Sequence, residues 1–160
     1  SRTSRALVLH QVTFRELCEA VDMLETMAMD VAIDRRSDAD LAAVADNIER
    51  SRAALDDPAA MADLEAEFHS LIAEATGNRV LQLAREPSGL MIRQTTRMIF
   101  ETVPEASRRS LEAREHLLEA LRRADRGAAR MWMRRHVADF AKGFARTGIS
   151  LDAPVARAQI

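Results

Sequence analysis

Three histidines and two glutamates stand at spacings that suit a metal site. Glu65 precedes His69 by four residues and Glu112 precedes His116 by four, so each pair shares one side of its helix if these segments are helical. His136 follows further along the chain. Imidazole and carboxylate groups are ligands for zinc, nickel, manganese and iron. The residues predict either one divalent metal site or, taken singly, surface and hydrogen-bonded core histidines.

Arginine is the second residue type here that can bind a ligand. Seven arginines lie between residues 114 and 135, which fits either a basic surface for nucleic acid or a solvated helix face. Aromatic residues barely interleave with them, which favours the solvated face. We predict that Arg93, Arg97 and Arg114 bind an anionic ligand.

An amphipathic helix, opened by the turn Asp56-Asp57-Pro58 and apolar on one face over residues 63–76, must position the first pair. Its apolar residues recur at steps of three and four, so they share one face, and Glu65 and His69 lie beside that face. Gly77 and Asn78 tolerate the left-handed conformation that ends helices.

The same periodicity predicts helices over about 14–33, 39–55, 107–124 and 126–146. A further helical region over 79–101 contains Pro87, which we expect to kink or break it. No segment alternates with period two for long enough to form a strand. The predicted fold is an all-α antiparallel bundle of six to seven helices.

The length of the chain fits one domain, and its net charge does not indicate that the chain as a whole binds nucleic acid. The chain has 160 residues, 48% of them hydrophobic, and a net charge of −2. Cys18 is the only cysteine, so we expect no internal disulfide and a reducing, cytoplasmic location. No uncharged apolar run approaches the roughly 20 residues that span a bilayer, so no membrane partner is predicted.

The run F-H-x-x-I-A-x-A-T-G-N-x-x-L at residues 68–81 resembles the signature of the FCD domain, the effector-sensing domain of FadR-subfamily GntR transcription regulators. The dipeptide Glu115-His116 and the spacing Met133-x-x-His136 resemble its last two helices. The resemblance covers residues 14–144. It implies an FCD-like bundle over 14–147 with an internal ligand pocket. From the residues themselves we expect a linker end over 1–13 and a loose tail over 148–160.

The resemblance also implies a ligand set and partners. Many FCD domains hold a divalent metal with one Asp and three His, and small carboxylates bind at or near it. Here the implied ligands are Glu65, His69, His116 and His136, holding zinc, nickel or manganese. The implied partners are a small carboxylate effector and a second copy in a homodimer. DNA would be bound only through a winged helix-turn-helix that is absent from these 160 residues.

Three departures from the family pattern bear on the ligand. Glu65 stands where the family has Asp, and Val21 stands where an effector-binding arginine is common. The last two family histidines are usually 22 residues apart, and the residue 22 before His136 is Arg114. Side chains two residues apart on a helix, such as those at positions 114 and 116, point in directions that differ by about 200°. Either a local shift restores His116, or Arg114 faces the pocket and binds an anion directly.

Three functions compete. The first is the ligand-sensing domain of a transcription regulator, with or without a metal. The second is a helical-bundle metalloenzyme of di-iron type, which uses Glu-x-x-His pairs at a spacing of three instead of the four found here. The third is a helical interaction module without a ligand. We predict the first, and no enzymatic activity.

Overall fold

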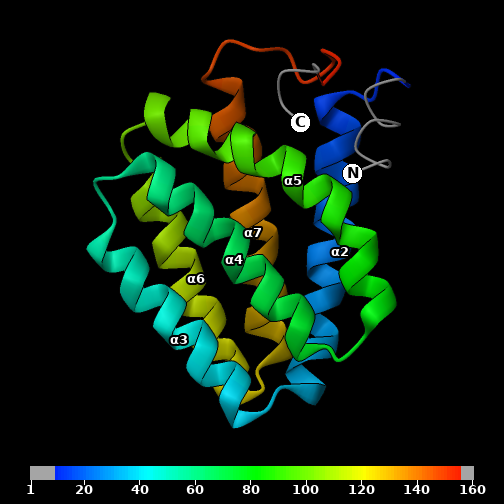
Figure 1. Cartoon of the computed structure of the whole chain (residues 1–160), viewed down its shortest axis with the longest axis vertical. Helices are drawn as coiled ribbons and strands as arrows, with labels where there is room; N and C mark the ends of the chain where they lie inside the picture. Colours follow the sequence, from blue (N-terminus) through cyan, green and yellow to red (C-terminus); the bar gives the residue numbers. More distant parts are fainter. Residues whose placement is uncertain (1–9, 156–160) are drawn as a thin grey trace.

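The described chain is built from helices. The computed structural model describes residues 10–155, apart from the side chains at positions 87, 88, 90 and 91. Six helices, labelled as in Figure 1, are α2 (Phe14–Arg35), α3 (Asp38–Ala53), α4 (Pro58–Ala75), α5 (Arg79–Thr102), α6 (Ala106–Arg123) and α7 (Arg126–Ala145). Within 10–155 the β-structure is a single isolated bridge between Thr13 and Pro154. The predicted all-α bundle is confirmed.

Local signals in the sequence set most helix starts. The hydroxyls of Thr13 and Ser37 cap α2 and α3, each in a reciprocal capping box with the third helical residue. The side chains of Asp57, Asn78 and Asp125 accept hydrogen bonds from the first turns of α4, α5 and α7. These caps satisfy backbone donors that would otherwise have no partner.

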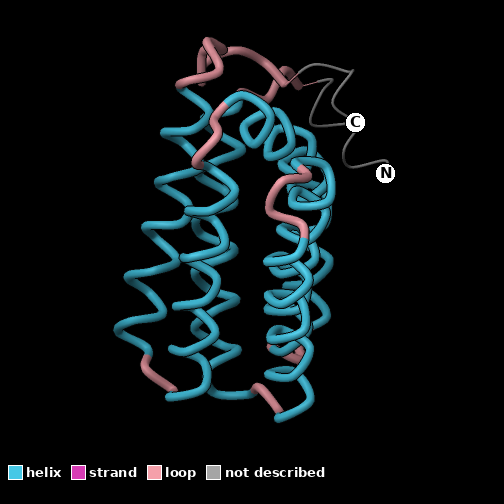
Figure 2. Tube along the Cα trace, turned by 90° about the vertical axis from the view of Figure 1, so that its left-hand side faces the viewer, coloured by secondary structure: helices cyan, strands magenta, loops and turns pink. Residues whose placement is uncertain are grey.

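The helices form two layers. In Figure 1, α6 and α7 pass behind α4, while α5 runs across the upper part of the bundle. Figure 2, turned by 90°, separates the layers and shows the connecting loops at the two ends. Three sequential pairs pack closely, α3 on α4, α4 on α5 and α6 on α7, and α2 closes the bundle by packing on α7. Short loops connect the sequential helices.

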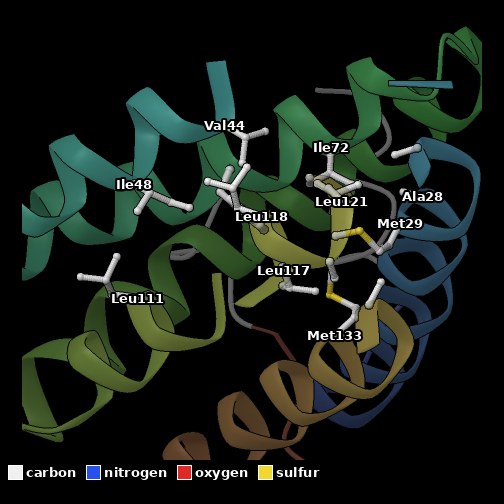
Figure 3. Close-up of a cluster of buried hydrophobic side chains, with 14 of the residues drawn as sticks. Ala28, Met29, Val44, Ile48, Ile72, Leu111, Leu117, Leu118, Leu121 and Met133 are labelled. Carbon is white, nitrogen blue, oxygen red and sulfur yellow. The ribbon is translucent and has the colours of Figure 1, made fainter. Parts of the chain in front are cut away.

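The hydrophobic core takes side chains from all six of these helices, and five of them meet in the part that Figure 3 draws. Figure 3 shows it as a cluster of aliphatic and methionine side chains: Ala28 and Met29 from α2, Val44 and Ile48 from α3, Ile72 from α4, Leu111, Leu117, Leu118 and Leu121 from α6, and Met133 from α7. The predicted apolar face of α4 is part of this core, since Phe68 and Ile72 are fully buried. Burial of this face fixes the rotation of α4 about its axis, and therefore the direction of its polar side chains.

Of the kink or break expected at Pro87, the break is absent, because α5 runs without interruption from Arg79 to Thr102. The helix changes direction along its course in Figure 1. Packing of α5 on α4 and α2 outweighs the roughly 3 kcal/mol that proline costs in a helix interior.

The C-terminal segment was expected to be a loose tail. Its described part instead packs against the start of α2: the amide of Val155 donates to the carbonyl of Val12 at 2.8 Å, and that of Arg15 donates to Leu151 at 2.9 Å. Val155 is 2% exposed. Residues 1–9 of the predicted linker and 156–160 of the predicted tail lie outside the described residues.

None of the described helices combines the length and the apolar composition needed to cross a bilayer.

Candidate ligand-binding site

A cavity of about 440 Å³ lies between α2, α4, α5, α6 and α7. One part of its wall is polar and holds Glu25, Glu65, His69, Arg85 and His136, which we call the polar cluster. Four helices contribute these five side chains: α2, α4, α5 and α7. The glutamates, Arg85 and His136 are at most 9% exposed.

Glu65 is the centre of the polar cluster. Its Oε1 lies 2.5 Å from Nε2 of His136 and 3.3 Å from Nε2 of His69. Ser110 of α6 donates its hydroxyl to the other oxygen, Oε2. The two imidazole rings stack on each other with centroids 5.4 Å apart. The carboxylate of Glu65 therefore holds both imidazole rings so that Nε2 of each ring faces the same oxygen, Oε1.

His69 is fixed from its other side by α2. Its Nδ1 lies 2.9 Å from Oε2 of Glu25, and the second oxygen of Glu25 accepts from Nε of Arg85 at 3.0 Å. Arg85 also donates to the hydroxyl of Ser70 at 3.2 Å. The contact at Nδ1 sets the orientation of the ring and directs Nε2 at Glu65.

The charges in the polar cluster stabilise one another. Burial alone would lower the pKa of His69, but Glu25 and Glu65 raise it to about 9. Burial alone would raise the pKa of Glu25, but His69 and Arg85 lower it below its ordinary value. The buried carboxylates are thus kept ionised by neighbouring cations.

Arg114 lies behind Glu65 and outside the cavity wall. Its side chain is fully buried. Its Nε lies 3.1 Å from Oε2 of Glu65, which makes an ion pair, but the N–H group does not point at the oxygen and forms no hydrogen bond with it. Its Nη1 donates to Asn47 at 3.2 Å and to Ser51 at 3.0 Å, which ties it to α3. Burial lowers the pKa of Arg114. Burial would raise the pKa of Glu65, but His136 and Arg114 hold it well below its usual range.

His116 is not part of the polar cluster, which corrects the predicted four-ligand set. It is exposed, and its ring stacks on Trp132 with centroids 3.9 Å apart and an interplanar angle of 9°. The rotation of about 200° between positions 114 and 116 explains this placement. With Arg114 turned into the bundle, His116 must face outward.

The two other predicted arginines differ in position. Arg93 lies at the edge of the cavity, where its Nε donates to Asp63 at 2.6 Å. Arg97 is more than half exposed, pairs with Glu101 at 2.8 Å and does not line the cavity. The structure therefore gives no support to Arg97 as a ligand-binding residue.

Sequence reasoning missed Glu25 and Arg85. A signal for each was present, because Glu25 precedes the buried Ala28 and Met29 by three and four residues, and Arg85 follows the buried Leu81 by four. A charged residue in phase with an apolar face is directed inward. Nothing in the sequence indicated that these two, 60 residues apart, pair with each other.

Three members of the polar cluster have the chemistry of a metal site. One ligand atom each from Glu65, His69 and His136 lies within 4.8 Å of the other two. Two imidazoles and a carboxylate suit a divalent ion with open coordination positions. The carboxylate of Glu25 on the far nitrogen of His69 is the arrangement that orients histidine ligands in such sites. The residues therefore fit a three-ligand site and not the predicted four-ligand one.

A solved structure has the same fold. That structure, E. coli McbR/YncC, superposes with a TM-score of 0.65 at 21% sequence identity, covering 80% of this chain. The matched region spans 65% of the McbR/YncC chain. None of the curated protein sequences compared with this chain matches it.

The family comparison covers the whole polar cluster. Residues 16–139 match the FCD domain family, and this range contains Glu25, Glu65, His69, Arg85 and His136. The match extends over well more than half of the chain and agrees with the helical bundle described above. This chain belongs to the FCD domain family.

Proposed function

We propose that this chain is the effector-sensing domain of a transcription regulator and that it binds a small carboxylate in the cavity. The observation that carries the proposal is a cavity of about 440 Å³ with four buried ionisable side chains and the partly buried His69 on one part of its wall. Membership of the FCD family supports the sensing role, because the effector-sensing domains of GntR regulators belong to it.

The energetics of burial favour a binding role for these charges. Ionised groups lose several kcal/mol of hydration on burial, and apolar side chains of similar size often stabilise a core better. Charged side chains such as Glu25, Glu65 and Arg85 at one cavity wall are expensive for stability alone. The donors that a carboxylate can use there are the planar guanidinium of Arg85 and the imidazole of His136, since both ring nitrogens of His69 contact glutamates.

Arg85 is the residue we propose for the head group. It lines the cavity, whereas Arg114 lies behind Glu65 and donates its hydrogen bonds to α3. In this proposal Arg114 positions Glu65, which in turn holds His69 and His136.

A divalent metal is the second candidate for the same site. The geometry that favours it is the approach of Glu65, His69 and His136 to within 4.8 Å. Zinc, nickel or manganese held there would leave open positions for the effector carboxylate, whose charge the ion would partly neutralise. Protein purified without chelator would then contain about one metal ion per chain, and dialysis against a chelator would remove it.

The wider partners are also proposals. A homodimer matches the two-fold operators that such regulators read, and DNA is bound through a winged helix-turn-helix outside these 160 residues. The di-iron enzyme is the weaker alternative, because the metal candidate set has a single carboxylate while di-iron sites use four.

Melting curves test the carboxylate proposal. The chain is heated with acetate, lactate, citrate, benzoate and octanoate, and with the amides of the same acids as uncharged controls. We expect at least one acid to raise the melting temperature in a concentration-dependent way while its amide does not. A melting temperature unchanged by every acid, with and without added zinc, nickel or manganese, would reject the proposal.

A further inference from the structure

Away from the polar cluster, the cavity lining has an apolar part and charged side chains that are exposed, among them Arg93, Arg109, Lys142 and Arg146. The apolar part, which we call the apolar wall, is formed by side chains of three helices: Val21 of α2, Ile92, Ile99 and Phe100 of α5, and Val137 and Phe140 of α7. A ligand with charge at every end would lose hydration against this wall without gaining a partner. The wall favours a ligand with an apolar body.

The size of the cavity exceeds that of a short acid. A water molecule takes about 30 Å³ in the liquid, so 440 Å³ corresponds to roughly 15 non-hydrogen atoms. Acetate and lactate have less than half of that number. A short acid at the polar cluster would leave the apolar part of the cavity without contacts.

Thr96 marks one polar point within the apolar wall. It lines the cavity at 2% exposure, and its hydroxyl has no hydrogen-bond partner among the described residues. A buried hydroxyl without a partner is costly, and in a helix a threonine ordinarily bonds to the carbonyl four residues earlier. Here a hydroxyl without a partner in the described part of the chain belongs to a residue that lines the cavity.

We propose that the effector is an amphipathic monocarboxylate of medium length with a hydrogen-bonding substituent on its body. Its carboxylate binds at the polar cluster, its hydrocarbon body contacts the walls of α5 and α7, and a carbonyl or hydroxyl on that body pairs with Thr96. The assignment of the carboxylate end rests on the proposed function above; the apolar body and the substituent do not.

A chain-length series tests the apolar body. The protein is titrated calorimetrically with acetate, butanoate, hexanoate and octanoate, which carry the same charge. We expect the affinity to rise about two- to fourfold with each buried CH₂, up to the length that fills the cavity. An affinity that is highest for acetate would overturn the apolar body and leave the carboxylate proposal intact. Absence of binding by every acid would reject the carboxylate proposal as well.

A hydroxyl deletion tests the substituent. Oxo-octanoates with the carbonyl at positions 4 to 7 are compared with octanoate on the unaltered chain and on Thr96→Val, which keeps the shape and removes the hydroxyl. We expect one oxo-octanoate to bind more tightly than octanoate, and Thr96→Val to weaken it by about five- to tenfold while changing octanoate less than twofold.

The neighbouring threonine supplies the matched control. Thr95 is equally buried, does not line the cavity and has an interaction partner. Thr95→Val should lower the melting temperature without changing the ratio between the oxo-acid and octanoate. Thr96 has no role in recognition if no oxo-octanoate exceeds octanoate, or if Thr96→Val keeps the same preference as the unaltered chain.

Discussion

At the scale of single residues, Arg114 carries its charge in a fully buried position. Its guanidinium is fully buried beside Glu65. Arg114→Met would leave that carboxylate with one cation fewer in a low-dielectric setting. We expect the free energy of unfolding, measured in urea, to fall by about 3–5 kcal/mol.

A double-mutant cycle separates this charge effect from packing. Glu65→Gln removes the carboxylate charge, so adding Arg114→Met to it should cost markedly less than Arg114→Met alone. If the two losses simply add, Arg114 acts through packing and its hydrogen bonds to α3, and it does not stabilise the charge of Glu65.

The histidines give a second residue-scale prediction, for the metal candidate. His69→Ala and His136→Ala should each abolish stoichiometric metal, measured by elemental mass spectrometry, because each removes one of three ligands. His116→Ala should retain it, because His116 lies on Trp132 at the surface. Loss of metal in His116→Ala would contradict the three-ligand site.

The sequence predicted part of the site at this scale. Spacing within one helix brought Glu65 and His69 together, and the choice between His116 and Arg114 could be stated but not decided. The contacts of His69 with Glu25 and of Glu25 with Arg85 join α2, α4 and α5. Such pairs depend on how whole helices pack, which local periodicity does not encode.

At the scale of elements, the end of α6 contains an unfavourable residue. Ala124 caps this helix in the left-handed conformation, at φ 54° and ψ 31°. A Cβ in that conformation costs roughly 1–2 kcal/mol, and glycine avoids it. Ala124→Gly should therefore raise the free energy of unfolding, measured in urea, by about 1 kcal/mol.

The end of α4 provides the reciprocal control. Gly77 has φ 61°, and a Cβ added there would meet no atom within 4 Å, so only conformation opposes substitution. Gly77→Ala should destabilise the protein by a similar amount. A stabilising Gly77→Ala, or a destabilising Ala124→Gly, would show that the left-handed conformation does not govern these helix ends.

Close packing of α5 on α7 depends on Gly143. A Cβ placed there would lie 2.7 Å from Cγ2 of Ile99, a methyl group held close to the backbone of α5. Gly143→Ala should lower the free energy of unfolding by about 1–3 kcal/mol, despite the higher helix propensity of alanine. Gly127→Ala, in the first turn of α7 with room for a Cβ, should be neutral or stabilising. Equal effects at both positions in chemical denaturation would contradict this view of the interface.

Helix boundaries were the most predictable feature of the fold. Capping residues such as Ser37, Asp57 and Asp125 act within one turn, so the sequence shows them directly. The continuity of α5 through Pro87 and the packing of Val155 against the start of α2 were not predictable, because contacts between distant segments decide both.

At the scale of the whole molecule, the bundle holds a cavity whose lining combines the polar cluster, an apolar wall and exposed charged side chains. Five helices contribute to it, and the hydrophobic core, part of which Figure 3 draws, contains side chains from all five. The sequence predicted the bundle, and the family resemblance implied an internal pocket. The cavity volume and the unpaired hydroxyl of Thr96 among the described residues follow only from the packed structure.

Calorimetric titration of the acid that raises the melting temperature most is the direct test of carboxylate recognition at the polar cluster. The unaltered chain should bind one molecule per chain, and Arg85→Met should weaken binding by at least about tenfold, because it removes the charged fork at the cavity wall. Arg97→Met, which removes an exposed arginine of the same helix outside the cavity, should bind like the unaltered chain. Equal affinities for Arg85→Met and the unaltered chain, or loss of binding in Arg97→Met, would contradict the assignment of the cavity as the effector site.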